Sequence, residues 1–115
     1  MEKDIVNHPN HYANTCSLEC IEVMEIIYGR RELFDYCKIN AFKYIWRYKN
    51  KNGNEDLEKA NWYCNKSIVL LNEMYERTGN SKQISDSDYF NEKKQINRMK
   101  EFINEKLRKE ILKEI

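Results

Sequence analysis

The chain has 115 residues, of which 41% are hydrophobic and 34% are charged, and its formal net charge is +1 at pH 7. This length indicates about one domain. With 3 Gly and 1 Pro, the chain lacks the many turns that a β-sandwich or β-barrel needs. The longest apolar run, Ile68–Leu71, is far shorter than the ~20 residues that cross a bilayer, and the first residues do not follow a signal-peptide pattern. We therefore expect a soluble, intracellular, all-α protein without a membrane partner.

The N-terminal residues 1–17 contain Pro9 and a cluster of Asn, Ser and Thr, which predicts an irregular arm. Apolar residues then recur at helical spacing and predict a bundle of three core helices followed by a long C-terminal helix. These four helices are expected over residues 18–28, 32–48, 54–77 and 89–115. We expect residues 1–78 to form the functional domain and residues 79–88, which are polar, to form a linker.

The predicted C-terminal helix carries an apolar stripe from Ile96 to Ile111, with Met99, Ile103 and Leu107 between them. An unbroken helix of this extent is ~40 Å long. Because such a helix is longer than the small domain that precedes it, we expect the stripe to pack on a neighbouring subunit. The sequence therefore predicts a homo-oligomer.

An acidic stretch near the N-terminus indicates a possible metal site. Glu19 and Glu22 are three residues apart and share one helix face. Asp56 joins them if the third helix begins nearby, and paired carboxylates hold Mg²⁺. The alternative is that Glu19 and Asp56 are first-turn acids that interact with the helix dipole.

Zinc is not expected, although four possible ligands lie close together near the N-terminus. They are His8, His11, Cys16 and Cys20. Their spacing matches none of the usual ligand pairs, and Cys20 falls on an apolar helix face.

A basic and aromatic face occupies the second and third predicted helices. Asn40, Lys43 and Arg47 form one stripe of the second helix. Tyr44 lies beside this stripe, and further along the chain Lys59 and Tyr63 align at i, i+4. Cationic side chains neutralise phosphates, Asn reads a base or sugar, and aromatic rings stack on bases. The alternative is a solvated basic face whose aromatic residues serve the core. The sequence contains no P-loop and no Gly-rich dinucleotide fingerprint.

Four ordered blocks resemble a small family of tailed-phage proteins over roughly residues 7–72. The blocks are Asn7-His8-Pro9-x-His11-Tyr12, Glu19-Cys20-Ile21-Glu22, Asn40-Ala41-Phe42-Lys43-Tyr44-Ile45-Trp46-Arg47 and Asp56-Leu57-x-Lys59-Ala60-x-Trp62-Tyr63. The family is often catalogued as a domain of unknown function. It includes a nucleotide kinase without a P-loop that phosphorylates deoxynucleoside monophosphates.

The resemblance implies a phage protein that handles nucleotides in the cytoplasm of an infected bacterium. It places the family's repeated residues on both candidate sites and adds His8, His11 and Tyr12 as residues that close over a phosphate or base. No residue receives a catalytic role.

Several functions stay open at this point. Nucleotide kinase activity is one, and sequestration of a nucleotide, such as a cyclic host immune signal, is another. Pyrophosphohydrolysis of the MazG kind is a third, because an E-x2-E helix facing a later Asp is similar to those all-α enzymes. Single-stranded nucleic-acid binding is the least favoured, because the net charge is close to zero.

Overall fold

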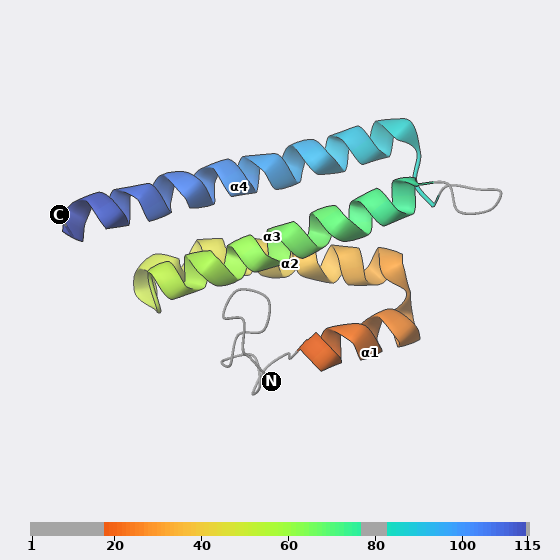
Figure 1. The fold of residues 1–115 in the computed structure, drawn as a ribbon, viewed down its shortest axis with the longest axis horizontal. Coiled ribbons are helices and arrows are strands. Elements are labelled where there is room, and N and C mark those ends of the chain that lie inside the picture. The colour runs from red at the N-terminus through yellow and green to blue at the C-terminus, as the bar shows by residue number, and fades with distance from the viewer. Residues whose placement is uncertain (1–17, 77–82, 115) are drawn as a thin grey trace.

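The computed structural model describes residues 18–76 and 83–114, with side chains placed for residues 19–76 and 83–109. Within these stretches the chain forms an all-α bundle without strands, as predicted. Its elements are α1 (Leu18–Tyr28), α2 (Arg30–Arg47), the short 3₁₀ helix η2 (Tyr48–Asn50), α3 (Asn54–Tyr75) and α4 (Asp86–Glu114) (Figure 1). Among the described residues, no helix has the length and apolar character needed to cross a membrane.

Glycines stand at the two places where the chain turns between α1, α2 and α3. Gly29 alone separates α1 from α2 and has a φ of 87°, while Gly53 precedes α3 with a φ of 58°. Positive φ values are costly for residues with a side chain. The Gly53 N–H donates to the Tyr48 carbonyl over 2.8 Å, which closes the turn after η2. As a result, α2 and α3 form an antiparallel hairpin (Figure 1).

The core lies mainly between α2 and α3, where the apolar stripes predicted from helical periodicity face each other. From α2 the buried residues include Phe34, Cys37 and Ala41, followed by Tyr48 of η2; from α3 they include Leu57, Ala60, Cys64 and Leu71. Burial of a large apolar side chain contributes about 1.5–3 kcal/mol. This packing fixes the position of the opposite, more polar faces of the two helices.

The apolar stripe of α4 packs on α3 of the same chain, which differs from the expected packing on another subunit. Ile96 and Ile103 are fully buried, and Met99 and Leu107 are partly buried against the same core. α4 runs alongside α3 for most of its length (Figure 1). The long helix therefore finds its support within one chain, because α3 is itself 22 residues long.

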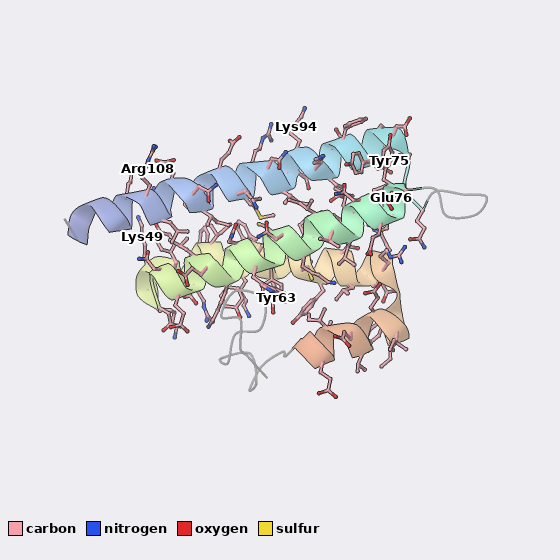
Figure 2. The ribbon with its side chains drawn as sticks, in the orientation of Figure 1. Lys49, Tyr63, Tyr75, Glu76, Lys94 and Arg108 are labelled. Atoms are coloured by element: carbon pink, nitrogen blue, oxygen red, sulfur yellow. The ribbon has the colours of Figure 1, made fainter. Side chains whose placement is uncertain are left out.

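The start of α4 also differs from the prediction, which placed residues 79–88 in a linker. Ser85 accepts a hydrogen bond from the Asp88 N–H over 3.2 Å and acts as the helix cap, so α4 begins at Asp86. Tyr89 stacks on Tyr75, the last residue of α3, with ring centroids 3.9 Å apart. Figure 2 shows Tyr75 at the end of the bundle where α3 ends and α4 begins.

Candidate functional site

An ion pair joins the end of α2 to the beginning of α3. Arg47 Nε lies 3.3 Å from Asp56 Oδ2, and Arg47 Nη2 lies 3.2 Å from Asp56 Oδ1. The guanidinium thus donates two hydrogen bonds to one carboxylate, which is the strong, oriented form of this interaction. The backbone N–H of Asn52 also donates to Oδ2 over 3.2 Å. Both oxygens of Asp56 are therefore engaged.

The two partners differ in their exposure to solvent. The Asp56 side chain is fully buried, whereas 34% of the Arg47 side chain is exposed. Burial by itself raises the pKa of Asp56, but hydrogen bonds from Arg47 and from the Asn52 backbone outweigh it and hold this pKa below the ordinary 3.8. The hydrogen bond to Asp56 raises the pKa of Arg47 in turn. At neutral pH, Asp56 is therefore a charged group that orients Arg47.

Three cationic side chains converge on the ring of Tyr44. Lys43 Nζ and Arg47 Cζ each lie 4.7 Å from the ring centroid, and Lys59 Nζ lies 5.5 Å from it. These distances are within the ~6 Å range of cation–π attraction. We call Lys43, Arg47 and Lys59, together with Tyr44, the Tyr44 cation cluster. The sequence had placed all four residues in one binding face.

Among the described residues, the positive charges of this cluster outnumber the carboxylates that pair with them. Lys59 is nearly buried and pairs with Glu55 Oε1 at 3.5 Å, while Asp56 pairs with Arg47. Lys43 is exposed and forms no ion pair with any described residue. Three cations thus face two carboxylates, which leaves an excess of one positive charge. Such a local field attracts an anionic ligand.

The aromatic residues predicted for base stacking lie in the core. Tyr44 and Tyr63 are both buried, and their rings stack on each other with centroids 5.8 Å apart and planes 11° apart. Trp62 and Tyr36 pack edge-on against Tyr63, which points away from α4 (Figure 2). Neither Tyr44 nor Tyr63 offers an open ring face to a base in this structure, in contrast to the sequence-based expectation.

Asn40 is partly exposed and lies one helical turn before Lys43, so it borders the cluster on α2. The remaining predicted nucleotide contacts, His8, His11 and Tyr12, lie outside the described residues.

The three acidic residues predicted to hold Mg²⁺ do not gather into one site. Glu19 and Glu22 are exposed on α1, whereas Asp56 is buried at the start of α3 and occupied by Arg47. Among the described residues, no group of three or more His, Cys, Asp or Glu side chains has an arrangement that could hold a metal ion. Asp56 is a first-turn acid of α3, as the alternative interpretation of the sequence stated, and the turn between α2 and α3 brings Arg47 to it.

A groove between α2 and α4 was not predicted from the sequence. It has a volume of about 540 Å³ and includes two exposed aromatic residues of α2, Phe42 and Trp46. The full described lining is Phe42, Ile45, Trp46, Tyr48, Lys49, Arg98, Met99, Phe102 and Lys106. We call it the α2–α4 groove. The sequence feature that could have indicated it is the i, i+4 spacing of Phe42 and Trp46, which lie off the buried stripe of α2. The residues on the α4 side of the groove are distant from these two in sequence.

Residues 6–65 match the model of a family described as protein of unknown function (DUF3310). The match covers residues 6–17, which lie outside the described residues, followed by α1, α2, η2 and the first half of α3, and so includes every residue of the Tyr44 cation cluster. No curated protein and no solved structure matches the chain.

Proposed function

The chain belongs to the DUF3310 family, and we propose that this member binds phosphorylated nucleosides at the Tyr44 cation cluster. The observation that carries this proposal is the convergence of Lys43, Arg47 and Lys59 within 5.5 Å of the centroid of one ring. Among the described residues, fewer carboxylates than cations pair within this group. Phosphate esters are held by charge-assisted hydrogen bonds from such side chains. The resemblance of the sequence to the family of tailed-phage proteins supports the same ligand class.

Arg47 is suited to a phosphate because Asp56 uses only part of its guanidinium. Asp56 accepts from Nε and Nη2, while Nη1 has no hydrogen-bond partner among the described residues. The Nη1 edge is therefore left for a phosphate oxygen. Since Asp56 fixes the orientation of the guanidinium, little side-chain entropy is lost when the ligand binds.

Recognition of the nucleoside itself is assigned to other residues. Asn40 borders the cluster and offers an amide to a base or sugar edge. Because Tyr44 and Tyr63 are buried, we do not propose that a base stacks on them. We propose instead that His8, His11 and Tyr12, which lie within the family match, contact the phosphate or base.

The hydrogen bonds of Asp56 support non-catalytic sequestration of the nucleotide over kinase or pyrophosphohydrolase activity. Metal-assisted phosphoryl transfer needs carboxylates that are available to Mg²⁺. Both oxygens of Asp56 already accept hydrogen bonds from Arg47 and Asn52. A phage protein of this kind holds its ligand intact, whether that ligand is a nucleoside monophosphate or a cyclic nucleotide signal.

The binding proposal is tested by calorimetric titration of deoxynucleoside monophosphates, nucleoside triphosphates and cyclic dinucleotides, each with and without Mg²⁺. We expect at least one class to bind and to raise the melting temperature, because a ligand specific for the folded state stabilises it. Lys43→Ala should weaken binding by about tenfold or more, the effect of one lost charged contact. Lys51→Ala removes an exposed lysine from the turn between α2 and α3 and should bind as the wild type does.

Failure of all three nucleotide classes to bind, or equal affinities of Lys43→Ala and the wild type, would contradict the proposal. Chromatography of the nucleotide after incubation with Mg²⁺ separates the two forms of the function. Intact nucleotide recovered from the denatured protein indicates sequestration. A phosphorylated or hydrolysed product indicates an enzyme.

A further inference from the structure

We propose that the α2–α4 groove of one molecule binds helix α1 of a second copy of this chain. This inference is independent of nucleotide binding, since the groove shares no residue with the Tyr44 cation cluster. The proposed contact covers two exposed apolar surfaces, the α2–α4 groove of one copy and the outer face of α1 of the other.

The groove combines exposed apolar side chains with a rim of one charge sign. Trp46 is 79% exposed and stacks on Phe42, with ring centroids 6.1 Å apart, while Phe102 forms part of the α4 wall. Lys49 and Arg98 are exposed cations of its rim. Lys106 adds a third, and no acidic residue occurs in the described lining. Exposed aromatic clusters with Arg nearby are typical of protein interfaces.

Helix α1 has the complementary character. Its sequence contains three acids, Glu19, Glu22 and Glu25, and no base. Its solvent face is also apolar, because Ile26 is 83% exposed and Ile27 is exposed as well. Residues 19, 22, 23, 26 and 27 share one face at helical spacing. Glu25 pairs with Arg30, but Glu19 and Glu22 on this face are exposed and form no ion pair with any described residue.

These two surfaces belong to opposite ends of one molecule. α1 joins α2 through the single residue Gly29 and lies where α2 begins, whereas the groove residues of α2 lie where α2 ends (Figure 1). α2 has 18 residues and spans about 27 Å. α1 is therefore held away from the groove of its own chain, and a second copy must supply it.

Charge decides how two copies pair. A groove facing a second groove brings cations together, and α1 facing a second α1 brings acids together. Docking of α1 in the groove brings the acids of α1 next to the cations of the groove. It also covers Ile26 of one copy and Trp46 of the other, which are both exposed in the single chain. Such a contact joins unlike surfaces, so it closes as a reciprocal dimer or a ring according to the rotation between copies.

The test is the molar mass of the full chain by light scattering and sedimentation over a range of protein concentrations. We expect the wild type to exceed the 14.0 kDa of one chain and to dissociate on dilution. Glu22→Lys and Arg98→Glu should each weaken association by about tenfold or more, because each places like charges in contact. The double variant Glu22→Lys/Arg98→Glu should regain association, since the charges are exchanged.

An equimolar mixture of the two single variants should also associate, because the intact α1 of Arg98→Glu fits the intact groove of Glu22→Lys. Glu58→Lys on α3 and Arg108→Glu on α4 are matched reversals of exposed charges outside both surfaces and should leave the assembly unchanged. Arg108 projects from α4 away from α3 (Figure 2). Thermal melting followed by circular dichroism verifies that each variant is folded.

Trp46 provides a second readout, because its fluorescence should shift to shorter wavelength as the protein associates, whereas that of the buried Trp62 should not. A monomeric wild type at every concentration would overturn the proposal. So would single variants that associate like the wild type, or a monomer whose Trp46 fluorescence responds to a single-stranded oligonucleotide instead.

Discussion

Arg47 and Asp56 form an ion pair in which one partner reaches solvent and the other does not. The Asp56 carboxylate is fully buried at the start of α3, while Arg47 extends from the end of α2 to the surface. The pair closes the hairpin of α2 and α3 and at the same time orients a residue of the proposed phosphate site. Its asymmetry makes the two partners unequal in their contribution to stability.

Substitution of Arg47 should destabilise the fold more than substitution of Asp56. Arg47→Ala leaves a buried carboxylate without its cation, which costs about 3 kcal/mol, the lower end of the range for buried pairs because Arg47 is partly exposed. Asp56→Asn leaves an arginine that reaches water and an amide oxygen that still accepts from Asn52, and should cost about 1–2 kcal/mol. Urea unfolding at pH 7 gives both free energies. Equal losses would contradict this interpretation of the pair.

Acid should weaken the fold through Asp56. The folded pKa of Asp56 is lowered below its ordinary 3.8 because the hydrogen bonds from Arg47 and Asn52 outweigh the opposing effect of burial. The ionised group therefore stabilises the folded state above the ordinary pKa, and this contribution is lost as the pH falls from there through the folded pKa.

Unfolding free energies of the wild type and Asp56→Asn, measured between neutral pH and strong acid, isolate this effect. The difference between the two proteins should be constant near neutral pH and shrink in acid. A difference that does not change with pH would show that Asp56 does not carry the linkage.

Helical periodicity was sufficient to predict α2 and α3 and most of their buried faces, because each helix has an apolar stripe that packs on its neighbours in the bundle. It failed for α1. Helical spacing joins Cys20, Val23, Met24 and Ile27 into one apolar stripe. Val23 and Ile27 are nevertheless exposed, whereas Ile21, which lies off this stripe, is buried. Apolar residues surround this short helix on nearly all sides, so spacing alone does not identify the face that packs.

The candidate site was predictable in part for a similar reason. Lys43, Tyr44 and Arg47 are neighbours on one helix, so their proximity follows from spacing. The engagement of Asp56 by Arg47 depends on the geometry of the turn between α2 and α3, which spacing does not encode. The α2–α4 groove joins Trp46 to Phe102, and only the packed bundle reveals that such distant residues share one surface.

Cys64 should be protected from alkylation in the folded protein. Burial raises the pKa of its thiol to about 12, with Lys100 opposing this only in part. Since the thiolate is the reactive form, iodoacetamide at pH 8 should modify Cys64 only when the core opens. Mass spectrometry of labelled peptides, with urea-unfolded protein as the control, measures this protection. Rapid labelling of Cys64 without denaturant would contradict the packing of α3.

Packing of α4 within its own chain makes a further prediction about two adjacent residues. Ile103 is fully buried against the core, whereas its neighbour Phe102 is partly exposed in the groove wall. Ile103→Ala should lower the free energy of unfolding by about 2–4 kcal/mol, the cost of a cavity in a packed core. Phe102→Ala should cost clearly less, because solvent already reaches that ring.

Urea unfolding followed by tryptophan fluorescence, repeated over a range of protein concentrations, distinguishes this packing from a contact between subunits. If α4 packs on α3 of the same chain, the loss caused by Ile103→Ala should be the same at every protein concentration, because Ile103 faces the core of its own chain and is not part of the groove proposed for association. A loss that grows with protein concentration would instead place the buried face of α4 in an oligomer contact, as the length of the helix had led us to expect from the sequence.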